Sequence, residues 1–212
     1  MQELPVLLDY LRSRSHLAEV VVVNDGSSPS DKLKGFCDSH SILLVQHQKN
    51  LGKGAAVRTG MLAAHEEIRV FTDADIPFQH DTFDAIFKAF EDAQVAVVAG
   101  DRRKSDYFAK TPLIRRAGSA VFSLLVDLIM LRRLGDTQCG IKAFRASAVE
   151  PVFQNQLLNG FAADIEWLHK ASQKGLRVVT VPAEFRNAGE SSVVFWKHAL
   201  LMLRDVLRLR FS

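Results

Sequence analysis

The sequence predicts an α/β fold in which helices flank a mostly parallel sheet. Short apolar or β-branched runs alternate with amphipathic segments throughout residues 1–100. The clearest strand is a valine run at residues 20–23 that ends in Asp25 and Gly26, as a buried parallel strand entering a loop does. Acidic residues also follow the strand predicted at 69–72. Polar residues at strand ends indicate the edge where such sheets bind ligands.

The elements of the first half follow from spacing and from turn residues. Leu4, Leu7, Leu8 and Leu11 recur at helical spacing and predict a helix that ends near residue 14. The valine strand follows over residues 19–24. The cycle then continues with a helix over 30–39, a strand over 42–46, a glycine-rich loop over 49–54, a helix over 55–65, a strand over 69–72, a helix over 81–93 and a strand over 95–99.

The second half is basic. Residues 1–100 hold 9 Lys and Arg against 14 Asp and Glu, whereas residues 101–212 hold 18 against 10. We therefore expect one domain over 1–212 with an acidic and a basic half. The basic half contains a long apolar segment over 117–131 between pairs of arginines, a strand over 140–144, helices over 146–154 and 164–174, a strand over 177–182 and a last helix over 195–209.

Composition excludes several classes of protein. With 48% hydrophobic and 24% charged residues, the chain is not expected to be disordered or fibrous. A net charge of +3 is too weak to indicate a nucleic-acid partner. Cys37 and Cys139 match neither a metal pair nor a disulfide framework, which favours a reducing, cytoplasmic setting. No H-E-x-x-H or G-x-S-x-G motif indicates a zinc protease or a serine hydrolase, and no apolar run is long enough to span a membrane.

Two carboxylates lie directly after the strand at 69–72. Asp73 and Asp75 flank Ala74 on a short loop before Pro77. Their oxygens can hold Mg²⁺ or Mn²⁺, and such an ion neutralises a bound diphosphate. A solvated turn or a helix N-cap pair would use the same residues.

Two further loops carry polar groups. Asp25, Gly26 and Ser27 can accept hydrogen bonds from a base or a ribose, with Gly26 letting the backbone approach closely, although a capped loop would look alike. Lys53 lies in the loop before the helix at 55–65, where it can meet a phosphate at the helix N-terminus. The Gly-Lys-Gly run that holds it is weak evidence alone.

Taken together, these loops resemble the family 2 glycosyltransferases, which have the GT-A fold. Within the family the chain is most similar to the dolichyl-phosphate or polyprenyl-phosphate sugar transferases, particularly the dolichyl-phosphate β-glucosyltransferase-like branch. The resemblance covers residues 4–210 and rests on these motifs: VVVNDGSS at 21–28, NLGKGAAVRTG at 50–60, DAD at 73–75, RRAGS at 115–119, DTQCGIK at 136–142 and GFAADIE at 160–166.

The resemblance implies a Rossmann-like sheet and roles for the first half, residues 1–100, as the part that binds nucleotide sugar and metal. Asp25, with Gly26 and Ser27, would contact the donor nucleobase. Lys53 and Asp73 would help to hold the nucleotide, and Asp75 would be the principal ligand of Mg²⁺ or Mn²⁺.

Residues 101–212 would form the acceptor half. In the family an arginine after the fifth strand binds the acceptor phosphate, and here this residue is Arg102, preceded by Asp101 in place of serine. Arg115 and Arg116 are further candidates, since planar guanidinium groups bind phosphate through two hydrogen bonds. The segments at 117–131 and 195–209 fit either a core helix or a helix at a membrane interface.

Three acidic residues are candidates for the catalytic centre, namely Asp136, Asp164 and Glu166. In relatives that use hydroxyl acceptors, an acid near this position serves as general base. A phosphate acceptor is already anionic, so these residues would then orient sugar hydroxyls or Lys142. Asp164 also fits a helix N-cap.

The implied function is an inverting transfer of a hexose, with glucose from UDP-glucose favoured, to dolichyl or polyprenyl phosphate. Three alternatives stay open: a GDP-mannose-dependent mannosyltransferase, a catalytically silent module that binds lipid phosphate or a partner, and a transferase that acts on a hydroxyl acceptor. The implied location is peripheral, at the cytosolic membrane face of the endoplasmic reticulum in a eukaryote or of the plasma membrane in a prokaryote.

The start of the chain departs from the family pattern. Family members begin with a strand that ends in a loop lining the nucleobase pocket, and this sequence begins at the helix that normally follows. We therefore expect the sheet to lack a strand beside residues 20–23 and to leave backbone groups there unpaired.

Overall fold

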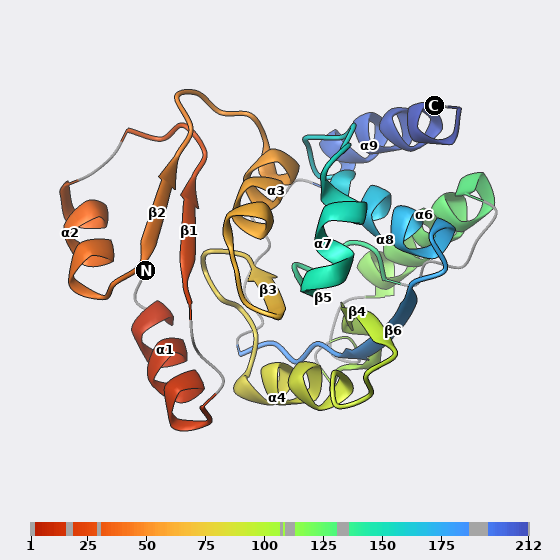
Figure 1. Cartoon of the computed structure of the whole chain (residues 1–212). Helices are drawn as coiled ribbons and strands as arrows, with labels where there is room; N and C mark the ends of the chain where they lie inside the picture. Colours follow the sequence, from red (N-terminus) through yellow and green to blue (C-terminus); the bar gives the residue numbers. More distant parts are fainter. Residues whose placement is uncertain are drawn as a thin grey trace.

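A computed structural model describes residues 3–15, 19–28, 31–106, 108, 113–130, 136–186 and 195–211 (Figure 1). Every helix and strand predicted above is present. The strands are β1 (Val21–Asn24), β2 (Leu43–Gln46), β3 (Ile68–Thr72), β4 (Val95–Asp101), β5 (Ile141–Arg145) and β6 (Arg177–Pro182). The α-helices are α1 (Glu3–Ser13), α2 (Asp31–Ser39), α3 (Lys53–Ala63), α4 (His80–Ala89), α6 (Leu113–Met130), α7 (Ala146–Phe153), α8 (Ala163–Gln173) and α9 (Phe195–Arg210), and a 3₁₀ turn, η1, covers Arg102–Lys104.

The strands form two sheets, and one strand runs against the predicted direction. β1 and β2 pair in parallel, and the second sheet has the order β3-β5-β4-β6. β4 and β6 are parallel, whereas β5 lies antiparallel to both β3 and β4. The α/β fold is thus confirmed, with a mixed second sheet. β5 is buried on both faces, so its apolar pattern equals that of a parallel strand and does not encode direction.

The sheet is interrupted beside the valine strand. Among the described strands, β1 is hydrogen-bonded to β2 and β3 is hydrogen-bonded to β5, with no ladder between β1 and β3. Helix α1 joins the two sheets, because Leu8 packs in the small core beneath β1 and β2 while Leu7 packs in a core of the larger sheet. In the described part of the chain, β1 is therefore paired along one side, with β2.

Helices cover both faces of the larger sheet. On one face, Val98 and Ile141 pack with residues of α1 and α4, including Ile86. On the other, Phe144 packs with α3, α6, α7, α8 and α9, and Trp167 of α8 lies at the centre of that core. Figure 1 places α2 and β2 at one end of the molecule and α6 and α9 at the other.

None of the helices that the structure describes has the length and apolar character needed to cross a membrane.

Candidate functional site

The candidate site lies where β1 and β3 end and α3 and α8 begin. Lys53 opens α3, Asp73 follows β3, and Asp164 stands in the first turn of α8. Lys53 Nζ lies 2.6 Å from Asp73 Oδ1. This ion pair joins the glycine-rich loop to the acidic turn, two features far apart in sequence.

Asp25 organises the loop that leads into α3. Its carboxylate accepts hydrogen bonds from the backbone N–H of Leu51 at 2.9 Å and of Gly52 at 2.8 Å, and His47 Nδ1 lies 2.7 Å from Oδ1. Burial opposes ionisation of Asp25, but these hydrogen bonds outweigh it and lower the pKa of the carboxyl below its ordinary value. Asp25 is therefore an anion that holds residues 51–52 in place.

The turn that carries Asp25 is held by its neighbours. The Asn24 side chain accepts from Ser27 N–H at 3.0 Å and donates to Ser27 C=O at 3.1 Å. Gly26 has φ of 82°, and a Cβ there would lie 2.2 Å from Asn50 N, so a side chain is excluded. Ser27 itself is exposed.

The start of α3 touches the loop that precedes α8. Ala55 N–H donates to Asn159 C=O at 3.2 Å. Gly52 has φ of 101°, and a Cβ there would lie 2.4 Å from Asn159 O. Two loops, 47–52 and 155–160, thus flank Lys53.

The environment of Lys53 stabilises its charged form. Burial disfavours the ammonium, but the carboxylates of Asp164 and Asp73 outweigh it and raise the pKa of Lys53. Asp73 also lies against the backbone before β5, since a Cβ on Gly140 would come within 2.0 Å of Asp73 Oδ2. Lys53 is therefore a fixed cation at a helix N-terminus, a suitable group for an anionic ligand.

Asp73 and Asp75 together offer a cation two carboxylates on one turn. Asp75 is exposed, and no third His, Cys, Asp or Glu of the described residues completes a cluster with them. These oxygens suit Mg²⁺ or Mn²⁺, with the remaining ligands to come from a bound molecule.

Arg102 and Asp136 form a two-pronged ion pair deeper in the site. Asp136 Oδ2 accepts from Arg102 Nε at 2.8 Å and from its backbone N–H at 3.0 Å, and Oδ1 accepts from Nη2 at 2.7 Å. Burial opposes both charges, yet the pairing lowers the pKa of Asp136 and raises that of Arg102. Two N–H groups of the guanidinium, on Nε and Nη2, are thus engaged within the protein.

Lys142 and Asp164 form a second buried pair. Lys142 is 0% exposed, and its Nζ donates to Asp164 Oδ1 at 2.5 Å and to Cys139 C=O at 2.8 Å. Burial raises the pKa of the Cys139 thiol to about 12, so Cys139 is a neutral thiol rather than a nucleophile.

Glu166 is buried and faces the loop before α8. Its two oxygens accept from the backbone N–H groups of Leu157 at 2.8 Å and Leu158 at 2.7 Å. Lys170 Nζ lies 2.7 Å from Oε1. All three candidate catalytic acids thus already have a cationic partner.

The candidate phosphate-binding arginines lie on two elements, Arg102 in η1 and Arg115 and Arg116 on α6. Arg103, next to Arg102, is bound to Asp101 by its Nε at 2.9 Å. Arg116 lies on α6 with its guanidinium 5.1 Å from the centre of the Phe108 ring. The side chain of Arg115 lies outside the described residues.

His47 was not identified as a site residue from the sequence, and Lys142 was named there only as a group that the candidate acids would orient. His47 bridges Asp25 and Thr59, whose Oγ1 lies 3.0 Å from His47 Nε2, and nothing in its local sequence indicates this. Lys142 ends the DTQCGIK motif, and a lysine inside an apolar strand is a signal that could have identified it.

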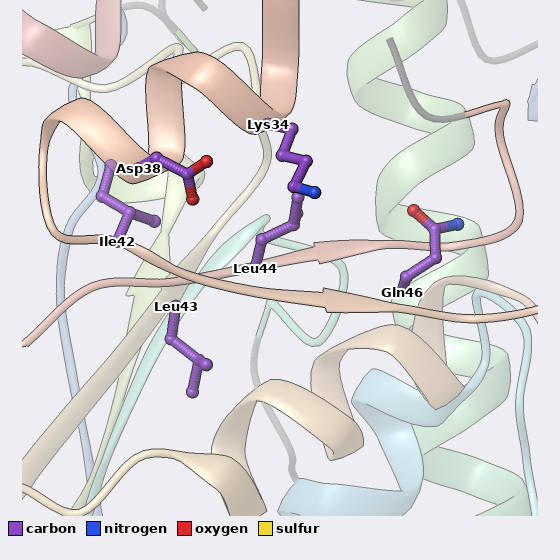
Figure 2. A pocket seen from close by; sticks show the side chains of 6 residues that line it. All are labelled: Lys34, Asp38, Ile42, Leu43, Leu44 and Gln46. Carbon is purple, nitrogen blue, oxygen red and sulfur yellow. The ribbon is translucent and has the colours of Figure 1, made fainter. Parts of the chain in front are cut away.

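A surface pocket lies away from this site. It is formed between α2 and β2 and is lined by Lys34, Asp38, Ile42, Leu43, Leu44 and Gln46 (Figure 2). None of the predicted site residues lines it.

Comparisons with known proteins show what the chain is similar to. The family model described as "Glycosyl transferase family 2" matches residues 2–153. Dolichyl-phosphate beta-glucosyltransferase ALG5A of Trichomonas vaginalis is 30% identical over 208 residues, which cover 91% of this chain and 64% of the relative. The human dolichyl-phosphate beta-glucosyltransferase is 27% identical, with 99% of this chain and 71% of the relative covered. The chain thus spans about two thirds of the length of these relatives.

Solved structures share the fold. Glucosyl-3-phosphoglycerate synthase from Mycobacterium tuberculosis, in complex with Mn²⁺, UDP-glucose and phosphoglyceric acid, superimposes with a TM-score of 0.67 at 14% identity, covering 92% of this chain and 69% of that one. Mannosyl-3-phosphoglycerate synthase from Rubrobacter xylanophilus gives a TM-score of 0.69 at 17% identity, covering 94% and 66%. With the family match over most of its length, the chain belongs to glycosyl transferase family 2.

Proposed function

We propose that this chain forms the catalytic domain of an inverting glucosyltransferase that moves glucose from UDP-glucose to the phosphate of dolichyl or another polyprenyl phosphate. The acceptor class is supported by the relatives, which are dolichyl-phosphate beta-glucosyltransferases. The donor is supported by a structural neighbour that binds UDP-glucose with Mn²⁺. The observation in this chain that carries the proposal is the Lys53–Asp73 ion pair.

At the donor end, the diphosphate of the nucleotide sugar would bind at the start of α3. Lys53 offers a fixed ammonium there, and Asp25 holds the adjacent backbone of Leu51 and Gly52. Asp73 and Asp75 would hold Mg²⁺ or Mn²⁺, which neutralises charge on the departing diphosphate. Charge stabilisation by groups fixed in advance is the main contribution of such a site to rate.

At the acceptor end, the pairing of the candidate acids favours a phosphate over a hydroxyl acceptor. Asp136 is bound to Arg102, Asp164 to Lys142 and Glu166 to Lys170. The pair with Arg102 lowers the pKa of Asp136, so this carboxylate is a weaker base than an ordinary aspartate. The oxygens of Glu166 accept from two backbone N–H groups, and Asp164 accepts from Lys142. A phosphate oxygen needs no base, since it is already anionic near neutral pH.

The transfer then needs no proton. An oxygen of the acceptor phosphate attacks the anomeric carbon of glucose, the bond from that carbon to the diphosphate oxygen breaks, and the electron pair leaves with UDP. Attack from the face opposite the leaving group converts an α-linked donor into a β-linked product. Of the candidate arginines, Arg116 would attract the acceptor phosphate. Arg102 would instead orient Asp136.

A membrane surface would present the acceptor, and α6 suits peripheral contact with it. One face of α6 is in the core through Phe122, Val126 and Met130. The other face is exposed and still apolar, with Leu124 at 68% and Leu128 at 67% exposure. Exposed apolar stripes of this kind fit a lipid interface. We place the protein at the cytosolic face of the membrane that holds the lipid phosphate.

Calorimetry with UDP-glucose tests the donor half of this proposal. We expect binding that requires Mn²⁺ and that is lost in Asp75→Ala, while the exposed Asp106→Ala variant binds like the wild type. Absence of binding to the wild-type chain would contradict the proposal. Tighter binding of GDP-mannose would instead favour a mannosyltransferase.

A further inference from the structure

The loop at residues 155–160 is held by one face of α8. Glu166 accepts from Leu157 and Leu158 N–H, as described above, and Lys170 Nζ donates to Asn155 C=O at 2.5 Å. Trp167 Nε1 donates to the Gln156 side chain at 2.8 Å. A six-residue stretch with no regular secondary structure is thus fixed by three residues of one helix.

The same loop supports the start of α3 from the other side. Asn159 C=O accepts from Ala55 N–H, and a Cβ on Gly54 would lie 2.5 Å from Ala163 Cβ and 2.8 Å from Leu158 O. No side chain separates the two backbones there. Any displacement of Leu158 is therefore transmitted to the helix turn that carries Lys53.

We propose that Glu166 is a positioning residue, which sets the place of Lys53 in the donor site by holding the 155–160 loop against the start of α3. Both oxygens of Glu166 are used by backbone N–H groups, and the residue is 0% exposed. It therefore lacks the access to an acceptor that a general base needs. This role rests on the proposed binding of a nucleotide sugar at Lys53, and it goes beyond that proposal by replacing a candidate catalytic role with an indirect one.

Two variants test the contact from opposite sides. Glu166→Gln removes the charge and one of the two backbone acceptors. Gly54→Ala leaves Glu166 intact but forces the start of α3 away from Leu158 and Ala163. Glu150→Gln, on the exposed side of α7, is the matched control for the loss of a carboxylate.

The first measurement does not depend on the donor. Amide hydrogen exchange should become faster at Leu157, Leu158 and Ala55 in Glu166→Gln, while Ala64, whose N–H bonds to Gly60 at the other end of α3, keeps its rate. Unchanged exchange at Ala55 would overturn the proposed coupling even if the chain bound no nucleotide sugar. The control variant should match the wild type at every amide.

The second measurement uses kinetics with UDP-glucose and dolichyl phosphate. Both test variants should raise the donor KM about tenfold or more, with a smaller change in kcat and no change in the shape of the pH–rate profile. A fall in kcat with loss of one limb of that profile in Glu166→Gln alone would show a general base and overturn the inference. Failure of the wild type to bind donor would count against the proposed function, and the exchange data would still decide the coupling.

Discussion

Arg102, directly after β4, and Asp136, before β5, are joined by three hydrogen bonds, two from the guanidinium and one from the backbone. The pair links two segments that are 34 residues apart. It also places a guanidinium and a carboxylate beside Lys142 and Asp164 in a charge-balanced group, which is buried apart from the half-buried Arg102. Replacing one charged residue of this group should therefore lower the free energy of unfolding.

Asp136→Asn should lower the free energy of unfolding by about 3 kcal/mol, because Arg102 would keep its charge and lose its partner. Urea unfolding of the two proteins measures this difference. Asp106→Asn, an exposed aspartate of the segment after η1, should change stability by less than about 0.5 kcal/mol. Equal stabilities for wild type and Asp136→Asn would show that the pair contributes nothing.

Stability should fall as the solution becomes acidic. The pKa values of Asp25 and Asp136 are lowered in the folded protein, so the unfolded chain takes up protons first as the pH falls. Their contribution is complete above the ordinary aspartate pKa of about 4 and is lost as the pH drops through the lower folded values. The urea midpoint should fall between about pH 5 and 2.5, and it should fall less steeply with pH in Asp136→Asn. An equal dependence on pH in the two proteins would show that Asp136 does not contribute to the loss of stability in acid.

Lys53→Met should weaken binding of UDP-glucose at least about tenfold, because the diphosphate loses a fixed cation. Lys53→Arg should retain part of the affinity. Lys49, exposed on the same loop, gives the matched control, and Lys49→Met should bind the donor like the wild type. If Lys53→Met and Lys49→Met bind UDP-glucose with similar affinity, Lys53 does not contact the donor.

The apolar face of α6 predicts contact with lipid. A double variant, Leu124→Gln with Leu128→Gln, should reduce co-sedimentation with vesicles that contain dolichyl phosphate and anionic lipid, without loss of stability, since both side chains are exposed. Leu62→Gln, at an exposed leucine of α3, should leave co-sedimentation unchanged. Equal vesicle binding by the wild type and both variants would show that the exposed face of α6 does not contact the lipid surface.

Neither cysteine should react in the folded protein. Cys37 and Cys139 are buried, and burial raises the pKa of both thiols, to about 12 for Cys139. Iodoacetamide near neutral pH should therefore modify both only after unfolding, as mass spectrometry can count. Rapid labelling of native Cys139 would contradict its burial.

The order of helices and strands could be predicted from the sequence because each element carries its own periodicity. The loops that hold Asp25, Lys53 and Asp73 could be predicted as neighbours, since carboxyl ends of parallel strands share one edge. The direction of β5 could not be predicted, because a strand buried on both faces has the same pattern either way.

The ion-pair partners of the buried charged residues also could not be predicted from the sequence. Glu166 lies near Asp164 in the motif that favoured a catalytic role, but its contacts depend on how the 155–160 loop folds back onto α8. Arg102 shows the same limit, because its pairing with Asp136 depends on the tertiary approach of β4 and β5. Motif resemblance selected the candidate residues, and the hydrogen bonds of the structure show which partners several of them have.

Product analysis tests the central claim most directly. The chain is incubated with UDP-[¹⁴C]glucose, Mn²⁺ and vesicles that contain dolichyl phosphate, and the lipid fraction is examined for labelled glucose and its linkage. We predict β-linked glucosyl phosphate lipid from the wild type and none from Asp75→Ala. Label that stays in the water-soluble fraction, or that reaches a hydroxyl acceptor without lipid, would contradict the account.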